Sequence, residues 1–391
     1  MDRRQFAFSA LATVAVSQAA AQEESPAYTV GVIGHTGRGN YGHGLDTVWQ
    51  RNDRTKIVAV ADANQVGLTK ATGRLKLDST AGFKEYRQML ESVRPDIIAV
   101  CPRHIDQHHD MVMAAIAAGA KGLYVEKPFL RTPAECDRVL AAAAKQNTRI
   151  AVAHRNRYHP VMDIVAEAIK QGRIGRLLEI RGRGKGDHRG GGEDLWVLGC
   201  HVFNMIHYLA GKPVSCSAEL LLDGRPVTPS DIREGAEGIG RLAGNELHAR
   251  FLMDSGVVAS FDSIANDQTG GHGFGLQLIG SKGIIGMRTD RDPLAHLVPG
   301  NPFEPTDKPR PWLPITTGGI DVVEPNPEMI KRIYNHDVAV ADLIASIGDR
   351  RKPLCNADEG ALTIEMICGV LLSHQRGESV SFPLDQREHP L

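Results

Sequence analysis

The stretch Tyr28-Thr-Val-Gly-Val-Ile33, followed at once by Gly34-His-Thr-Gly-Arg-Gly-Asn-Tyr-Gly42, decides the fold of this chain. The first six residues are typical of a buried strand, and the glycine turn behind them leads into a helical pattern. A strand, a glycine turn and a helix in this order form the site where the pyrophosphate of a dinucleotide binds. The residues predicted to line it are Gly34, Thr36, Gly37, Arg38 and Gly39, with Thr36 at the position of the motif's second glycine.

A carboxylate follows the next predicted strand, residues 56–61. Asp62 ends that strand, 23 residues after Gly39, which is about where a carboxylate accepts hydrogen bonds from an adenosine ribose. No arginine comes directly after Asp62. We therefore predict NAD as the cofactor, with NADP as the alternative.

The pattern of apolar runs divides the chain in two. Up to His154, strands predicted at 96–101, 122–125 and 149–153 alternate with helical stretches, which is typical of a doubly wound parallel sheet. Beyond residue 159, period-two runs joined by Asp254-Ser-Gly256 predict an antiparallel hairpin. We expect an α/β chain with a Rossmann domain at 28–154 and an α+β domain, built on a mostly antiparallel sheet, at 155–391.

Two further groups of residues follow predicted parallel strands, at the edge where a ligand crevice opens. They are Cys101, Pro102 and Arg103 after one strand, and Glu126, Lys127 and Pro128 after another. All six are predicted to line the cofactor. Lys127 is also a predicted catalytic residue, because its ammonium can donate to a substrate oxygen.

With these motifs the chain resembles the Gfo/Idh/MocA family, named for glucose-fructose oxidoreductase, inositol dehydrogenase and rhizopine catabolism. The resemblance covers nearly everything after residue 21, including Gly175, the segment Gly199-Cys-His201 and residues 377–384. It implies a nicotinamide-dependent oxidoreductase, a cis bond before Pro128 and a catalytic role for His201. Imidazole suits proton transfer near neutral pH.

Some positions depart from that family's pattern. Its sugar dehydrogenases carry an aspartate four residues before the catalytic histidine, and this chain has Val197 there. Asp194 lies seven residues before His201, about 10 Å along a helix, which is too far to pair directly. The family's aspartate, histidine and asparagine at three other positions are replaced by Asn204, Asp106 and Arg103.

The substrate side is predicted from the residues after the last Rossmann strand and from a glycine-rich loop at 181–192. Tyr158 is the third predicted catalytic residue. The predicted substrate-binding residues are His154, Arg157, His159, Asp187, His188, Arg189 and Asn204. A polar lining suits a polyol, because each hydroxyl needs donors and acceptors; the alternative is a polar loop at an ordinary domain junction. Because the histidines and acids lack an ordered ligand spacing, no metal site is predicted.

Three functions stay open. The first is an oxidoreductase for a sugar, polyol or glycoside, with tightly held NAD as hydride acceptor, His201 taking the hydroxyl proton and Lys127 polarising the oxygen. The second is a redox-neutral glycosidase or lyase, in which transient oxidation acidifies a neighbouring C–H, elimination expels the leaving group and the hydride returns; Val197 favours keeping it. The third is a non-catalytic sugar-binding or nucleotide-binding protein, because two family carboxylates are absent.

The N-terminal 21 residues read as an export signal. Arg3 and Arg4 precede an apolar stretch to Val16, and alanines at 19–21 offer a cleavage site, so we predict twin-arginine export of a folded protein to the periplasm. No later segment reaches about 18 uninterrupted apolar residues, so no stable membrane insertion is predicted. The six cysteines, which lack CxxC spacing, are predicted to be buried free thiols.

The predicted partner is a small-molecule sugar or glycoside. A net charge of -1 argues against a nucleic-acid partner, which requires a basic surface. The predicted antiparallel sheet has one face covered by helices. Because its other face needs covering, we expect a homodimer or homotetramer.

Overall fold

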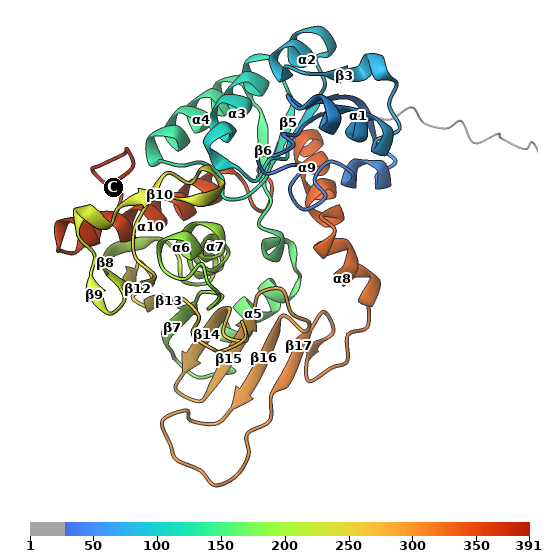
Figure 1. Ribbon diagram of the computed structural model, residues 1–391. Helices are drawn as coiled ribbons and strands as arrows, with labels where there is room; N and C mark the ends of the chain where they lie inside the picture. The colour runs from blue at the N-terminus through green and yellow to red at the C-terminus, as the bar shows by residue number, and fades with distance from the viewer. Residues whose placement is uncertain (1–27) are drawn as a thin grey trace, which may run out of the picture.

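The computed structural model describes residues 28–391; the predicted export signal lies outside the described residues. Two sheets dominate the molecule, a parallel one at the top of Figure 1 and a large mixed one below it. The chain crosses from the first to the second after residue 152 and returns with its last helices. The predicted fold class, a Rossmann sheet followed by a mostly antiparallel sheet, is confirmed.

The first sheet has six parallel strands in the order β3-β2-β1-β4-β5-β6. The strands are β1 Tyr28–Ile33, β2 Thr55–Ala61, β3 Gly82–Phe83, β4 Ile97–Val100, β5 Gly122–Val125 and β6 Arg149–Val152. Their near-continuous burial is expected of strands covered on both faces. Because the strand order reverses between β1 and β4, a crevice opens at their carboxyl ends.

The helices of this region are α1 Gln65–Arg74, α2 Tyr86–Val93, α3 His108–Ala117 and α4 Pro133–Gln146. The helix expected directly after the glycine turn is not formed, and that prediction was wrong. In its place the chain makes turns and a short 3₁₀ helix, Val48–Arg51. Gly37, Gly39, Gly42 and Gly44 all have positive φ, which interrupts a right-handed helix at every turn.

The second sheet has eleven strands, and β7 and β13 form its one parallel pair. Its strands are β7 Leu177–Arg183, β8 Pro213–Leu222, β9 Arg225–Pro226, β12 Glu246–Met253, β13 Val258–Ile264, β14 Gly275–Gly280, β15 Gly283–Arg288, β16 Ala295–Pro299, β17 Leu313–Thr316, β18 Gly319–Ile320 and β19 Val380–Ser381. The predicted hairpin at 247–261 is confirmed as β12–β13. The proline-rich segment 301–327 supplies β17 and the edge strand β18.

Three helices, α5 Val161–Lys170, α6 Gly192–Val197 and α7 Gly199–Ala210, lie between the two sheets or against the second. A short ribbon, β10 Arg233–Glu234 and β11 Arg241–Leu242, projects toward the first domain. Its loop places Glu237 within 3.7 Å of Arg103. Both domains therefore contribute to the crevice at the ends of the parallel strands.

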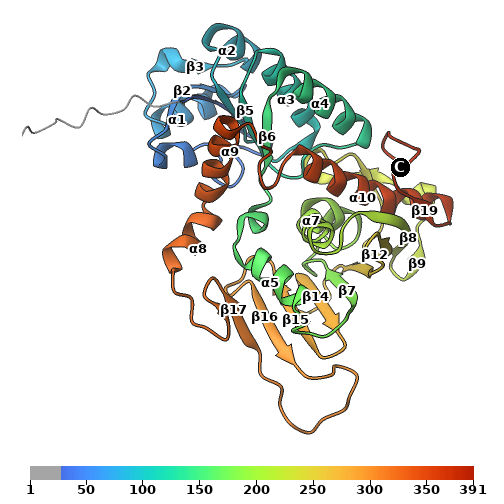
Figure 2. The same cartoon turned by 180° about the vertical axis from the view of Figure 1, so that it is seen from behind.

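The C-terminal helices are α8 Pro327–Tyr334, α9 Asp337–Asp349 and α10 Ala357–Arg376. The turquoise-green strands β5 and β6 are covered by the orange-red helix α9, as Figure 2 shows from behind. A Cβ on Gly122 would lie 2.6 Å from Cδ1 of Ile347, so α9 packs closely against β5 at this glycine. The hydroxyl of Tyr124 on β5 is hydrogen-bonded to Nδ1 of His336, at 2.6 Å.

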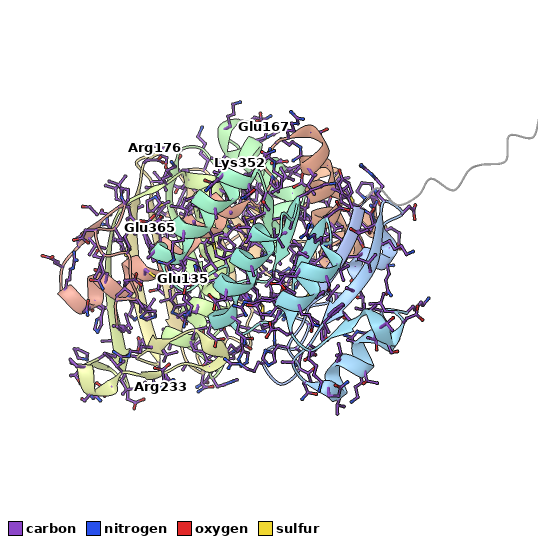
Figure 3. All side chains as sticks on the ribbon, turned by 90° about the horizontal axis from the view of Figure 1, so that it is seen from above. Glu135, Glu167, Arg176, Arg233, Lys352 and Glu365 are labelled. Atoms are coloured by element: carbon purple, nitrogen blue, oxygen red, sulfur yellow. The ribbon has the colours of Figure 1, made fainter. Side chains whose placement is uncertain are left out.

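Helices α4 and α10 lie side by side at the junction of the domains, where Figure 3 labels Glu135 and Glu365. The C-terminal tail ties them together, because Arg387 contacts Asp137 on α4 at 2.6 Å and Glu365 on α10. All six cysteines are buried and unpaired, as predicted. Among residues 28–391, no helix has both the length and the apolar character needed to cross a membrane.

Candidate active site

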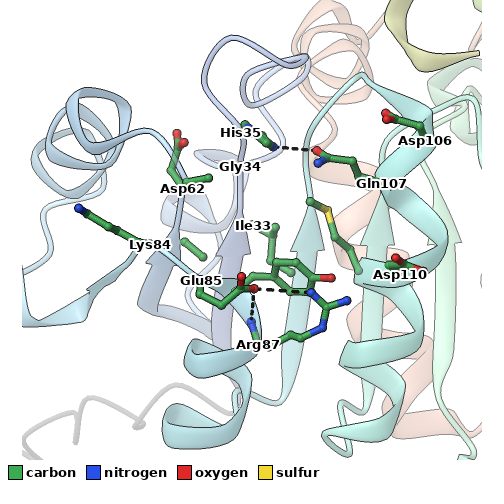
Figure 4. A pocket seen from close by; sticks show the side chains of 14 residues that line it. Ile33, Gly34, His35, Asp62, Lys84, Glu85, Arg87, Asp106, Gln107 and Asp110 are labelled. Carbon is green, nitrogen blue, oxygen red and sulfur yellow. Dashed lines mark hydrogen bonds and ion pairs between the residues drawn. The ribbon is translucent and has the colours of Figure 1, made fainter.

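Two hollows lie at the carboxyl ends of the parallel strands. The first, which we call the β2 pocket, has a volume of 270 Å³ and lies between Asp62 at the end of β2 and Gln107 beside α3 (Figure 4). The second, the β5 crevice, has a volume of 180 Å³ and lies between the domains. Its charged and imidazole side chains are those of His43, Arg103, Glu126, Lys127, Arg155, Lys185, Arg189, His201, Glu237, Asp290 and His336.

The glycine turn lies between these hollows, across the ends of β4 and β5. A Cβ on Gly39 would lie 2.2 Å from the backbone nitrogen of Arg103, and one on Gly42 would lie 2.5 Å from Oε2 of Glu126. The N–H of Arg103 donates to the carbonyl of Gly39, at 3.3 Å. At these two positions only glycine permits the close approach.

The Asp62 carboxylate is occupied by groups of its own domain. It accepts hydrogen bonds from the Thr36 N–H at 3.1 Å, the Thr36 hydroxyl at 2.6 Å, the Tyr41 hydroxyl at 2.8 Å and the Asn64 N–H at 2.9 Å. Asp62 is 1% exposed. In this conformation the Asp62 carboxylate therefore holds the glycine turn against the end of β2. The predicted hydrogen bond from a ribose to Asp62 stays a prediction.

Two side-chain contacts join the far side of the turn to the loop after β4. Nδ1 of His35 lies 2.8 Å from Oε1 of Gln107, a contact drawn in Figure 4. Arg38 pairs with Asp106. The two hollows share no lining residue in this conformation.

At the end of β5, Glu126 is a buried carboxylate with two partners. Its Oε1 accepts the N–H of Lys127 at 3.0 Å, and its Oε2 lies 3.2 Å from Nδ1 of His43. Burial alone would raise the pKa of Glu126, but the hydrogen bond from His43 and the charges of His43 and Lys127 outweigh it and hold the pKa at about 2. The carboxylate is thus ionised and held beside the turn.

Lys127 projects into the β5 crevice from the segment after β5. It is 8% exposed, and its Nζ donates to the carbonyl of Val197 at 3.1 Å. The Lys127–Pro128 peptide bond is cis. The ammonium therefore lies within reach of a ligand bound against α6 and α7.

His201 lies in the first turn of α7 and also lines the crevice. Its Nδ1 is buried without a hydrogen-bond partner, as expected from the valine in place of the family's aspartate. The ring of His154 meets it edge to face, with centroids 5.3 Å apart. Burial, followed by the nearby charges of Lys127 and His154, lowers the pKa of His201 well below its usual value, so the imidazole is neutral.

His154 is buried with neither ring nitrogen paired. Burial, together with the charge of Lys127, lowers its pKa to about 3. Asp194 does not reach His201. Its carboxylate accepts from the Ser263 hydroxyl at 2.5 Å and from the Lys185 N–H at 3.4 Å, and burial raises its pKa.

Arg189 is the one predicted substrate residue of the glycine-rich loop that lines the crevice. Asp187 holds its guanidinium at 2.5 Å, whereas His188 is exposed. Of these neighbouring side chains, that of Arg189 thus faces the crevice and that of His188 faces the solvent.

The third predicted catalytic residue, Tyr158, does not line the crevice, and neither do the remaining predicted substrate-binding residues. The Tyr158 hydroxyl donates to the carbonyl of Cys355 at 3.5 Å in the interior. Arg157 stacks on the ring of Tyr208 and reaches Glu359, and Asn204 bonds Thr363 at 3.1 Å. His159 lines a separate cavity. The 3₁₀ helix Arg155–Tyr158 turns these side chains in different directions, and only Arg155 enters the crevice.

Sequence reasoning missed several crevice residues, namely His43, Arg155, Lys185, Glu237, Asp290 and His336. They come from six separate segments, and only the tertiary fold brings them together. His108 was also missed. Two residues after Asp106, it is completely buried and links the strand ends, because its Nε2 lies 2.7 Å from the carbonyl of Pro102 and its Nδ1 3.1 Å from that of Pro128.

The residues present fit a dinucleotide at both ends. The β2 pocket lies where the adenosine half binds in folds of this strand order, and the β5 crevice lies at the switch point beyond β4. The close backbone approach at Gly39 and Gly42 leaves the turn free of side chains there. Within residues 28–391, no group of three or more histidine, cysteine, aspartate or glutamate side chains is arranged to hold a metal ion.

A six-stranded sheet of order 3-2-1-4-5-6, joined to a second domain that closes over its strand ends, defines a two-domain nucleotide-binding protein. The chain belongs to the Gfo/Idh/MocA family. Residues 28–154 match the family's "Oxidoreductase family, NAD-binding Rossmann fold" domain, and residues 166–382 match its "C-terminal alpha/beta domain".

Individual relatives are distant. Levoglucosan dehydrogenase of Pseudarthrobacter phenanthrenivorans is 24% identical over 59% of this chain and 65% of its own length. Myo-inositol 2-dehydrogenase of Thermotoga maritima is 24% identical over 47% of this chain and 55% of its own.

Solved structures share the fold. A levoglucosan dehydrogenase in complex with NADH and levoglucosan superimposes with a TM-score of 0.70 at 18% identity, over 91% of this chain and 99% of that one. The WlbA dehydrogenase from Bordetella pertussis, in complex with NADH and UDP-GlcNAcA, gives a TM-score of 0.66 with the same identity and coverage.

Proposed function

We propose that this protein is an exported, NAD-dependent oxidoreductase that acts on a sugar, a polyol or a glycoside. The observation that carries the proposal is the pairing of Lys127 and His201 across one crevice at the switch point of a Rossmann sheet. The family's NAD-binding domain supports the cofactor. The names of the relatives, which include levoglucosan and inositol dehydrogenases, support the substrate class.

The cofactor would be held by residues at the two hollows and between them. Those at the adenosine end are Gly34, Asp62 and Gln107; those at the nicotinamide end are Arg103, Glu126 and Lys127. When bound, NAD supplies an acceptor for a hydride. We keep NADP as the alternative.

The chain's own residues handle the proton. His201 is neutral and so can accept the proton of a substrate hydroxyl. Lys127 offers an ammonium that stabilises negative charge developing on that oxygen. Its present acceptor, the Val197 carbonyl, is a neutral group that a substrate oxygen can replace. Arg155, Lys185 and Arg189 add donors that suit several hydroxyl groups.

The redox-neutral alternative, a glycosidase or lyase, is favoured by one observation. Nδ1 of His201 lacks the carboxylate partner that would stabilise an imidazolium. The valine at position 197 is thus the departure from the family's sugar dehydrogenases that keeps this alternative open. In it the proton that the base removes on oxidation returns to the oxygen on reduction.

Export by the twin-arginine route and tight retention of the cofactor belong together in this proposal. A periplasmic enzyme has no evident NAD pool to draw on, so a cofactor that dissociates is lost by dilution. Retention at nanomolar protein demands a dissociation constant near nanomolar, about -12 kcal/mol. We also keep the proposal of a homodimer or homotetramer, supported by the large second sheet.

The experiment is to purify the protein without added cofactor, record its native mass spectrum and supply candidate glycosides or a sugar pair. Copurified NAD, with cleavage or hydride exchange and no NADH in solution, would support the redox-neutral alternative with retained cofactor. Stoichiometric release of NADH, with turnover that depends on external NAD, would support the simple dehydrogenase and contradict retention. Absence of both cofactor and turnover would favour a sugar-binding protein.

A further inference from the structure

A third cavity, apart from the two hollows, is lined by residues of α5, β17 and α8. Figure 1 shows these three elements below the parallel sheet. Its volume is 340 Å³, within the range of small-molecule sites. Most of its wall is apolar, formed by Val161, Pro293, Leu294, Ile315, Pro327 and Ile330. We call it the His159 cavity, after the imidazole that lines it.

The tautomer of His159 follows from its contacts. Nδ1 accepts the backbone N–H of Val161 at 3.1 Å. Because a backbone N–H can only donate, Nδ1 carries no proton, and a neutral ring must carry its proton on Nε2. Burial lowers the pKa of His159 to about 4, against the opposing charges of Asp292 and Glu324, so the ring is neutral at pH 7.

The proton on Nε2 has no acceptor. His159 is 3% exposed, and its Nε2 is buried without a hydrogen-bond partner. Leaving a buried donor unpaired costs about 1–3 kcal/mol. An unpaired N–H in the wall of a cavity of this size is therefore a point at which a ligand oxygen gains a hydrogen bond.

The other polar groups of the wall are already paired. Glu324 accepts from Thr317 and from the Asn326 N–H at 2.8 Å. Asp292 accepts from the Tyr334 hydroxyl at 2.8 Å. Lys331 pairs with Glu328 at 2.6 Å. Among the residues that line this cavity, Nε2 of His159 is thus the one buried side-chain nitrogen or oxygen without a hydrogen-bond partner.

We propose that the His159 cavity is a second ligand site, which takes an uncharged, largely apolar small molecule that presents one oxygen acceptor to Nε2 of His159. The site shares no lining residue with the β5 crevice, and one side-chain contact links the two. Arg155, which pairs with Asp290 in the crevice, lies over the ring of Tyr334 at 5.1 Å. Binding here requires neither sugar nor NAD, so it can be tested independently of the proposed reaction.

The probes are acetophenone and ethylbenzene, which have the same number of heavy atoms apart from the carbonyl oxygen. We expect saturable binding of both in ligand-observed NMR titrations, with acetophenone about 2- to 12-fold tighter, the worth of one hydrogen bond. In His159→Leu the preference for acetophenone should disappear. Benzoate should bind more weakly than either probe, because its charge would be buried without a partner.

A second pair of variants keeps the test valid if His159→Leu folds poorly. Ile330→Trp places a bulky side chain inside the cavity and should abolish binding of both probes. Arg332→Trp, at an exposed position of the same helix, should leave binding unchanged. Thermal unfolding of each variant shows whether it is folded.

Three results would overturn the proposal. The first is no saturable binding of acetophenone to the wild-type protein. The second is equal affinity for the two probes, unaffected by His159→Leu, which would mean that a trapped water satisfies the imidazole. The third is loss of self-association in Ile330→Trp by analytical ultracentrifugation, which would assign the cavity to a second copy of the chain.

Discussion

The strand ends of β1 and β5 each carry a motif, and the two motifs use their polar groups in opposite directions. After β5, Glu126 is turned inward to His43, while Lys127 projects into a crevice between the domains. After β1, the glycine turn directs its polar groups to the protein, and Thr36 and Tyr41 occupy the Asp62 carboxylate. Motif spacing therefore locates the backbone at both sites, but neighbouring side chains decide whether a polar group is available to a ligand.

The sharpest test of the β5 side is removal of its reacting groups. Lys127→Met and His201→Ala should each lower kcat about 10²- to 10⁴-fold, because a general acid-base group is lost from the site of proton transfer. Thermal unfolding should be nearly unchanged. The measurement is kcat with any substrate that the wild-type protein turns over.

Lys185→Met is the matched control, because it removes an ammonium that lines the same crevice. If it lowered kcat as far as Lys127→Met does, the total charge of the crevice would matter and the position of Lys127 would not. Near-normal rates in His201→Ala would place the base elsewhere, and His154 would be the nearest imidazole.

Alanine variants of two glycines in the β1 turn can distinguish the cost of a positive φ from the cost of a clash between a new Cβ and the neighbouring backbone. Gly37 has φ +86° with open space around its Cβ position, and Gly39 has φ +83° with the Arg103 nitrogen at 2.2 Å. Both alanine variants pay a similar conformational cost, but Gly39→Ala should be destabilised by about 1–3 kcal/mol more because of overpacking. Urea denaturation of the two variants measures the difference. Equal losses would show that the turn relaxes away from β4.

Acid titration contrasts the β5 side with the turn, because His154, His201 and His336, three histidines whose pKa values are lowered by burial, lie near the end of β5. The pKa of His154 is lowered to about 3, below its unfolded value, so the unfolded chain binds more protons between pH 6.5 and 3. Its contribution to the free energy of unfolding is complete above pH 6.5 and falls by about 1.4 kcal/mol per unit as the pH drops. Urea denaturation of wild-type and His154→Phe protein at pH 6 and pH 5 should show a shallower pH dependence in the variant, and an unchanged slope would contradict its burial as a neutral ring.

The smallest expected effect discriminates two roles for Asp62. Tyr41→Phe removes one hydrogen bond to the carboxylate and should cost about 1 kcal/mol of stability. If Asp62 serves only to hold the turn, Tyr41→Phe and Asp62→Ala should both weaken NAD binding, because the turn loosens. If it also binds the ribose, Tyr41→Phe frees an oxygen and should leave NAD affinity equal or tighter, while Asp62→Ala weakens it. Fluorescence titration with NADH measures both variants.

The sequence predicted the parts of the fold that depend on local patterns. The strands at 28–33 and 122–125 and the hairpin at 247–261 match the structure because alternation and burial are periodic along the chain. The helix after the glycine turn was wrong, since four glycines with positive φ override the helical pattern that follows.

The site was predictable only where a motif marks a strand end. Lys127 and His201 lie in the crevice, but Tyr158 and Asn204 are directed into the interior by hydrogen bonds to Cys355 and Thr363, more than 150 residues away. No local signal in the sequence indicates that Asp290 and His336 line the same crevice as Lys127 and His201. Such residues are brought together by the packing of distant segments. The periodicity of a single sequence does not predict which distant segments pack against one another.

The placement of α9 on β5 and β6 has a consequence for the order of events during synthesis. The ribosome delivers all six strands of the parallel sheet by residue 152, yet the groups that seal one face of it, His336 and Ile347, are among the last to emerge. Val152 likewise waits for the carbonyl of Cys355. A nascent chain that ends before Asp337 therefore lacks the helix that covers this face of β5 and β6. If the chain is exported folded, as proposed above, export has to follow the packing of α9 on β5 and β6.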